Sequence, residues 1–165
     1  MKKEKETFLQ LIQQHKGIII KICHSHCSKQ SERDDLAQEI VFNLWKAFDQ
    51  YKPDYKFSTW MYRIALNVAI SFYRKEQRAL TFSPYNENLM VFDDDNNSMV
   101  ELDSNLSLLQ KFIYNLKEID RSIMLLYLDD KSYKEIAEII GISETNVATR
   151  INRIKMYLKS KFTTN

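Results

Sequence analysis

Apolar residues recur at helical spacing along most of this 165-residue chain, which contains only 2 glycines and 2 prolines. Phe8, Leu11 and Ile12 open the first such series, at intervals that place them on one face of a helix. Average proteins contain roughly 7% glycine and 5% proline, so this chain has little material for tight turns or glycine-lined phosphate loops. We therefore expect an all-α fold.

The spacing predicts three helices in the first part of the chain, over about residues 5–27, 32–51 and 58–78. Pro53 and Asp54 interrupt the pattern between the second and third helices. A serine hydroxyl can accept a hydrogen bond from the first turn, so Ser31 and Ser58 are predicted to cap these two helices. The predicted buried stripe of the third helix consists of Met61, Ile64, Ala65, Val68 and Phe72.

Charge divides the chain into three parts. Residues 1–80 hold 14 Lys/Arg and 9 Asp/Glu, residues 81–105 hold 0 and 6, and residues 106–165 hold 10 and 7. The middle part also lacks sustained helical periodicity. We expect two small helical domains, 1–80 and 106–165, joined by an extended acidic linker over 81–105. Two basic modules on one tether indicate a protein that binds a polyanion such as DNA.

The last domain is predicted to hold four helices and to contain a helix-turn-helix over residues 133–152. Ala137 is small where two helices would cross, and Gly141 permits a left-handed turn. Ser132 is predicted to form a capping box with Glu135, and Ser143 is predicted to cap the last helix, over about 144–162. The residues expected to fill the space between the two helices are Ile136, Ile140, Ile142, Val147 and Ile151.

A helix-turn-helix lays the amino end of its second helix in the major groove. The residues that this helix would offer to base edges and phosphates are Glu144, Thr145, Asn146, Thr149, Arg150 and Arg153. An ordinary helical hairpin with a solvated charged face is the alternative interpretation, and it does not require so many steric positions to be filled correctly.

The third predicted helix carries a second polar and basic stripe, made of Arg63, Asn67, Ser71, Arg74 and Arg78, with Lys52, Lys56 and Lys75 nearby. Half of the aromatic residues of the chain fall within residues 42–73, and bases that have lost their pairing stack on such rings. We expect most of these rings, including Trp45, Phe48, Trp60 and Phe72, to be core. The candidates for stacking are Tyr55, Tyr62 and Tyr73.

Two stretches carry a family resemblance: Asp35-Leu36-Ala37-Gln38-Glu39 and Phe57-Ser58-Thr59-Trp60-Met61-Tyr62-Arg63-Ile64-Ala65-Leu66-Asn67. Together with the acidic linker and the terminal helix-turn-helix, they resemble the extracytoplasmic-function group of the bacterial sigma-70 family. The resemblance implies a sigma factor that directs core RNA polymerase to promoter DNA and helps to melt it. It implies no catalysis and no cofactor. Residues 1–80 would be sigma region 2 and residues 106–165 sigma region 4.

The resemblance also assigns roles to individual positions. Asp35, Gln38, Glu39 and Asn43 would dock on the clamp coiled coil of the polymerase beta-prime subunit, and the second domain would meet the beta flap. The linker would run toward the RNA exit path, and an anti-sigma factor would regulate the protein. Residues implied to contact the minus-ten element are Lys56, Ser58, Thr59, Tyr62, Arg63, Asn67, Ser71, Arg74 and Lys75. The last helix would recognise the minus-thirty-five element.

This sequence departs from the family pattern at two positions. Ser71 stands where many members carry an acidic residue, which puts the base preference of that position in doubt. Lys117 stands where a proline often opens the second helix of region 4, which suggests a local change in how that helix begins.

Zinc is suggested by Cys23, His24, His26 and Cys27, since thiolate and imidazole are its preferred ligands. On a helix, however, the two cysteines share one face while the histidines point elsewhere, so we expect small core cysteines and no metal. With no continuous apolar stretch, we expect a cytoplasmic protein without direct membrane insertion. Two rival functions are a helix-turn-helix regulator that binds duplex DNA as a dimer without polymerase, and a nucleic-acid-processing enzyme.

Overall fold

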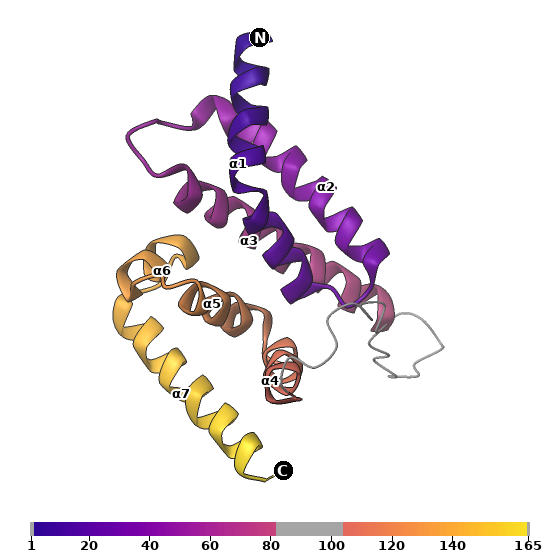
Figure 1. Cartoon of the computed structure of the whole chain (residues 1–165), viewed down its shortest axis with the longest axis vertical. Helices are drawn as coiled ribbons and strands as arrows, with labels where there is room; N and C mark the ends of the chain where they lie inside the picture. Colours follow the sequence, from indigo (N-terminus) through magenta and orange to yellow (C-terminus); the bar gives the residue numbers. More distant parts are fainter. Residues whose placement is uncertain (1, 82–103, 165) are drawn as a thin grey trace. The chain divides into compact units, whose positions relative to one another are not determined.

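The computed structural model describes residues 2–81 and 104–164, and these residues form helices joined by short connections. The chain divides into two compact units, Met1–Val91 and Phe92–Asn165 (Figure 1). The predicted all-α class is therefore confirmed for this part of the chain. Most of the predicted linker, residues 82–103, lies outside the described residues.

Three long helices build the first unit: α1 (Lys2–His26), α2 (Gln30–Ala47) and α3 (Phe57–Thr81). A single 3-10 turn, η1 (Phe48–Gln50), extends α2, and each long helix packs against the other two (Figure 1). The largest side chains that are completely buried between them are Ile22, Leu36, Ile40, Leu44, Met61, Tyr62 and Leu66.

The predicted caps of α2 and α3 are wrong. Both helices begin before the serine that was expected to cap them, so Ser31 and Ser58 lie inside the first turn. The carbonyls of Lys29 and Lys56 instead accept the first helical hydrogen bonds, from the nitrogens of Arg33 at 3.1 Å and Trp60 at 3.2 Å.

The buried face of α3 is broader than the predicted stripe and is rotated around the helix. Ile64, Val68 and Phe72 are only partly buried. Because α3 packs against both α1 and α2, two neighbours cover its surface instead of one. The fully covered residues are Met61, Tyr62, Ala65, Leu66 and Ala69.

The second unit contains the four predicted helices: α4 (Ser104–Tyr114), α5 (Glu118–Leu128), α6 (Tyr133–Ile140) and α7 (Glu144–Thr163). Helices α5, α6 and α7 pack against one another. Leu109, Phe112 and Ile113 of α4 cover a core cluster of Met124, Ile154 and Leu158. Lys117 precedes α5, and its carbonyl accepts the nitrogen of Arg121 at 2.9 Å, so the helix begins without proline.

Arg121 is a buried cation that sequence reasoning did not single out. Its side chain is 1% exposed, and Nη2 donates to the carbonyls of Tyr114 and Leu116, the latter at 3.0 Å. The guanidinium carbon lies 4.7 Å from the centroid of the Tyr114 ring. Because the last carbonyls of a helix lack partners within it, Arg121 satisfies the end of α4 and holds the turn into α5.

Candidate nucleic-acid interface

Helices α6 and α7 form the predicted helix-turn-helix, and its local signals are confirmed. The Ser132 hydroxyl accepts from the nitrogen of Glu135 at 3.2 Å, while Glu135 Oε2 accepts from the nitrogen of Ser132 at 2.9 Å. Gly141 ends α6 in the left-handed conformation with φ 82°. Ser143 caps α7 by accepting from the nitrogen of Asn146 at 3.1 Å. These contacts fix where each helix begins and how sharply the chain turns.

Apolar residues hold the two helices of the motif together. Ile136, Val147 and Ile151 are completely buried, as predicted, and Ile139 is buried as well. Ile140 and Ile142 are only partly covered. The opposite side of α7 is thereby left to solvent, because a helix packed along one face exposes the other.

Six polar residues on the first three turns of α7 form what we call the α7 strip: Glu144, Thr145, Asn146, Thr149, Arg150 and Arg153. Five are exposed, and Arg150 is partly buried because it reaches α5. Its Nη1 donates to Asp120 Oδ1 at 2.7 Å, and its Nε donates to Asn146 Oδ1 at 3.1 Å. The Thr149 hydroxyl donates to the carbonyl of Thr145 at 2.9 Å. Several side chains of this strip are therefore oriented by the protein itself.

A second polar strip runs along α3. We call it the α3 strip, and it comprises Arg63, Asn67, Ser71, Arg74, Lys75 and Arg78. All six are exposed, as their spacing predicted. Four of them carry positive charge, so the strip suits a phosphate backbone.

Aromatic side chains anchor the loop that precedes α3. The Tyr51 ring lies 5.3 Å from Phe57 and 5.1 Å from Trp60, measured between ring centroids. Its hydroxyl donates to the carbonyl of Tyr55 at 2.8 Å. The Tyr55 side chain itself is 68% exposed, so a fixed loop presents an accessible ring. Lys56 of the same loop is exposed as well.

The expectation that Tyr62 stacks on DNA is wrong, because its side chain is 1% exposed within the three-helix core. Tyr73 is partly buried, which leaves Tyr55 as the most exposed of the three candidates. The residues Ser58 and Thr59 are half-buried at the start of α3. Trp45, which was expected in the core, is 42% exposed, although its ring packs 5.0 Å from that of Phe8.

Helix α2 carries the α2 face, which consists of Asp35, Gln38, Glu39 and Asn43. The first three are exposed, and Asn43 Nδ2 donates to the carbonyl of Glu39 at 2.8 Å. Burial raises the pKa of Glu76 on α3, and the negative charges of Glu32 and Asp35 raise it further. Carboxylates from α2 and α3 thus reinforce a negative potential here, and basic partners are favoured.

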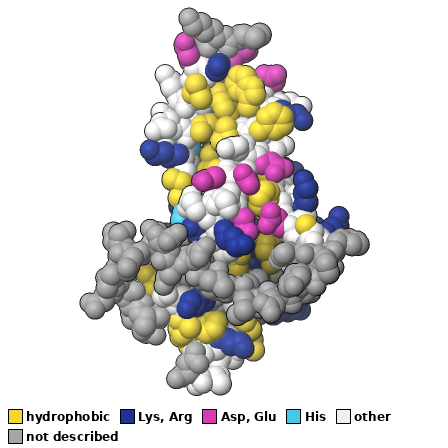
Figure 2. Space-filling view, turned by 90° about the vertical axis from the view of Figure 1, so that its right-hand side faces the viewer, with side chains coloured by type: hydrophobic (Ala, Val, Ile, Leu, Met, Phe, Trp, Pro, Cys, Tyr) yellow, Lys and Arg dark blue, Asp and Glu magenta, His cyan; other side chains and the backbone are white. Residues whose placement is uncertain are grey.

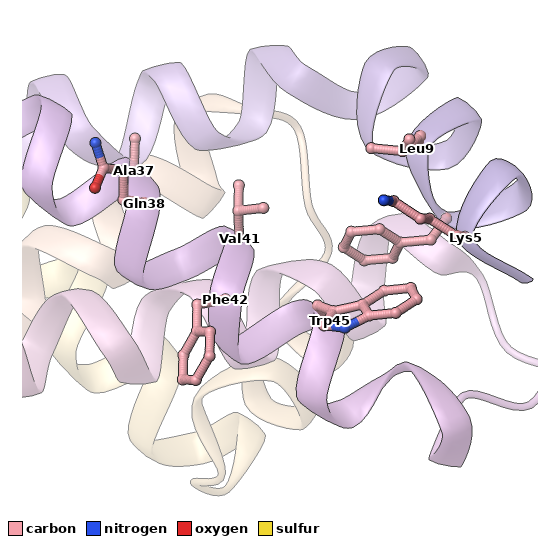
Figure 3. A pocket seen from close by; sticks show the side chains of 8 residues that line it. Lys5, Leu9, Ala37, Gln38, Val41, Phe42 and Trp45 are labelled. Atoms are coloured by element: carbon pink, nitrogen blue, oxygen red, sulfur yellow. The ribbon is translucent and has the colours of Figure 1, made fainter. Parts of the chain in front are cut away.

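An apolar groove adjoins the α2 face, between α1 and α2 (Figure 3). It has a volume of about 550 Å³, and Gln38 belongs both to its lining and to the α2 face. Phe42 and Leu9 in its wall are 60% and 53% exposed. Figure 2 shows hydrophobic side chains gathered beside carboxylates on this side of the first unit. Sequence reasoning missed the groove, because its residues follow the same helical spacing as core residues.

The cysteines near the end of α1 are buried free thiols, as expected of core residues. Burial raises the pKa of Cys23 to about 11 and that of Cys27 to about 12. Partial desolvation lowers the pKa of His24, and the positive charge of Arg33 lowers it further. Among the described residues, no three His, Cys, Asp or Glu side chains are grouped so that they could hold a metal ion. None of the helices in the described ranges is long and apolar enough to cross a membrane.

Comparison with known proteins matches both units. Residues 11–79 match the model of Sigma-70 region 2, and residues 106–158 match that of Sigma-70, region 4. The ECF RNA polymerase sigma factor SigW of Bacillus subtilis is 27% identical over 170 residues, which cover 97% of this chain and 91% of SigW.

Two solved structures have the same fold. One is CnrH in complex with the cytosolic domain of CnrY, which aligns with a TM-score of 0.69 and 21% identity over 98% of this chain and 90% of CnrH. The other is the sigma factor RpoE in complex with the anti-sigma factor NepR from Bartonella quintana. It aligns with a TM-score of 0.68 and 20% identity over 100% of this chain and 99% of RpoE.

Proposed function

This chain belongs to the extracytoplasmic-function group of the sigma-70 family, and we propose that its two units divide promoter recognition between them. It is an RNA polymerase sigma factor and not an enzyme. The observation that carries the proposed division of labour is that each unit exposes its own polar strip with basic residues, one on α3 and one on α7. We assign residues 1–80 to region 2, 81–105 to an acidic linker and 106–165 to region 4. Helix α3 ends at Thr81 and α4 begins at Ser104, so these two helices reach into the ends of the assigned linker.

The α7 strip is proposed to recognise the minus-thirty-five element as duplex DNA. Exposed side chains on the first turns of α7 are where a helix-turn-helix contacts base edges in the major groove. Arg153 is exposed one turn beyond Thr149 and is assigned to a phosphate. The capped and tightly turned motif supports this assignment, because it fixes the angle at which α7 leaves α6.

The α3 strip and the loop before it are proposed to bind the minus-ten element once its strands separate. An exposed ring at Tyr55 and cations at Lys56, Arg63 and Lys75 provide a stacking surface beside a track for the backbone. Extrusion of a base costs a few kcal/mol, which these contacts must offset. Asn67, Ser71 and Arg74 belong to the same track, whereas Ser58 and Thr59 are assigned to the loop edge. Tyr62 is not assigned to this DNA-binding surface, because its side chain is buried.

The α2 face is proposed to bind the clamp coiled coil of the beta-prime subunit, and the second unit is proposed to contact the beta flap. Exposed Asp35 and Glu39, supported by the charge of Glu76, complement a basic helical partner. We further propose that the linker, with 6 acidic and no basic residues, follows the RNA exit path.

An anti-sigma factor is proposed as the regulator of this protein. RpoE and NepR form such a complex in their solved structure. A pull-down from unstressed cells of the native host should recover the partner together with the sigma factor. Recovery of core polymerase alone under those conditions would contradict this assignment.

Run-off transcription from genomic templates with core polymerase of the same host tests the proposed function. We expect discrete transcripts only when this protein is added. A Gln38→Ala/Glu39→Ala variant should lose them through weaker core binding, whereas Lys16→Ala, an exposed change on α1, should not. Specific duplex binding without polymerase, together with no start sites in the run-off assay, would favour the rival regulator. DNA turnover with a divalent metal would favour the rival enzyme.

A further inference from the structure

Three polar side chains link the α7 strip to α5 in the second unit. Arg150 is the central one of the three. Its Nη1 donates to Asp120 Oδ1 at 2.7 Å, and its Nε donates to Asn146 Oδ1 at 3.1 Å. Asp120 lies in the first turn of α5, and Asn146 lies in the first turn of α7. The side chains of Arg150 and Asp120 are 33% and 24% exposed, so the ion pair is partly shielded from water.

Asp120 decides which way the guanidinium of Arg150 faces. A guanidinium is planar and rigid, so a carboxylate that holds Nη1 also sets the directions of the remaining donors. Two of the three guanidinium nitrogens then serve partners within the protein. Only Nη2 has no partner among the described residues. Arg150 is therefore engaged in positioning its neighbours before DNA arrives.

The guanidinium in turn decides which way the amide of Asn146 faces. Every guanidinium nitrogen donates and none accepts, so the amide atom directed at Arg150 must be the oxygen. The amide NH₂ of Asn146 consequently points away from Arg150, on an exposed residue. Without this contact, an exposed asparagine side chain could present either its oxygen or its nitrogen.

We propose that Asp120 is a positioning residue for recognition of the upstream element. Acting through Arg150, it holds Asn146 so that the amide NH₂ meets an acceptor on a base edge. In the major groove such acceptors are N7 of purines, O6 of guanine and O4 of thymine, whereas cytosine presents a donor. Asn146 would thus select against cytosine at one position. The inference rests on the proposed role of α7 in the duplex groove.

The test uses a promoter library in which the upstream element is randomised. The polymerase holoenzyme that contains this protein selects promoters from that library, and the selected sequences give its base preference at each position. Asn146→Ala identifies the position that Asn146 reads. At that position we expect Asp120→Asn to lower discrimination against cytosine by at least about fivefold, the lower end for a base contact. Asp120→Glu, which keeps a carboxylate, should restore most of it. The double variant Asp120→Asn/Asn146→Ala should lose no more discrimination against cytosine at that position than Asn146→Ala alone.

Glu118→Gln is the matched control, because it removes the same charge from the same turn of α5. It should leave the base preference unchanged. Unchanged preference in Asp120→Asn, or a uniform loss at all positions together with a lower melting temperature, would overturn the inference. So would an Asn146→Ala variant that changes no position. If the unmodified holoenzyme showed no preference anywhere in the element, the proposed function of α7 would itself fail.

Discussion

The α7 strip and the α3 strip each place an arginine near an asparagine, Arg150 with Asn146 and Arg63 with Asn67, but the protein holds these two pairs differently. On α7, Arg150 and Asn146 are oriented by hydrogen bonds and an ion pair. On α3, Arg63 and Asn67 have no hydrogen bond to another described residue. A duplex groove has a fixed geometry, and preoriented side chains lose less entropy when they bind it. An unpaired strand is irregular, so side chains that can adjust, such as those of Arg63 and Asn67, suit it better.

The two units should respond separately to damage of their cores. Ile136→Asp places a charge at a completely buried position of the second unit and should cost about 4 kcal/mol or more. Hydrogen exchange should then show loss of protection in α5–α7 and unchanged protection in α1–α3. Lys134→Asp, on the exposed side of the same helix, should cost no more than about 0.5 kcal/mol. Loss of protection in α1–α3 as well would show that the units do not fold separately.

The same substitution at the two glycines should change stability in opposite directions. Gly141 has a φ of 82°, so Gly141→Ala should destabilise the second unit by about 1–2 kcal/mol. Gly17 lies inside α1, and a Cβ there meets no atom within 4 Å. Gly17→Ala should therefore stabilise the first unit by about 0.5–1 kcal/mol. Denaturant unfolding, followed separately for each unit, measures the two changes in the free energy of unfolding. If both substitutions stabilised the protein, or both destabilised it, the assigned conformations would be contradicted.

Salt dependence should separate the two strips. The quantity to measure is how the binding constant K of the holoenzyme for DNA depends on salt. For a duplex with the upstream element, Arg153→Ala should reduce the slope of log K against log salt by about 0.9, because one phosphate contact is lost. On a forked template without the upstream element it should have no effect. Lys75→Ala should leave the slope on the upstream duplex unchanged. It should reduce the slope by about 0.7 on the forked template, whose minus-ten strand is unpaired. Slopes that change equally on both templates would remove the distinction between the strips.

A further effect concerns pH and the first unit alone. Burial raises the pKa values of Cys23 and Cys27 to about 11 and about 12, so folding favours the neutral thiols. Their stabilising contribution is complete below the pKa of an unfolded thiol, roughly 8.5, and declines as pH rises through the folded values. Urea midpoints of the first unit should therefore fall between pH 8 and 10.5. The decline should be weaker in Cys23→Ala/Cys27→Ala, and an identical decline in that variant would contradict the assignment to the thiols.

The sequence was most informative where one residue type satisfies a local requirement. Gly141 must adopt the left-handed backbone conformation, and Ser132 and Ser143 must accept hydrogen bonds from the helical turns that follow them. These requirements allowed the helix-turn-helix to be located to the residue. Ser31 and Ser58 carry the same signal, yet α2 and α3 begin before them. A possible cap therefore marks a helix start only approximately.

Contacts between helices were not readable from the sequence. Tyr62 and Trp45 are both aromatic residues at helical spacing, and only packing decides that Tyr62 is buried and Trp45 exposed. The pairing of Asp120 with Arg150 likewise joins residues 30 positions apart. No local pattern distinguishes that aspartate from the other acidic residues of the second unit.

Open-complex formation on duplex and on pre-melted promoters tests the division of labour most directly. With Asn67→Ala, we expect opening of the duplex promoter to slow about two- to tenfold, the loss of one hydrogen bond, with initial docking unchanged. Pre-melting the minus-ten element should abolish that defect, whereas the docking defect of Asn146→Ala should persist on both templates. Equal losses of docking and opening in Asn67→Ala, on both templates, would contradict the account.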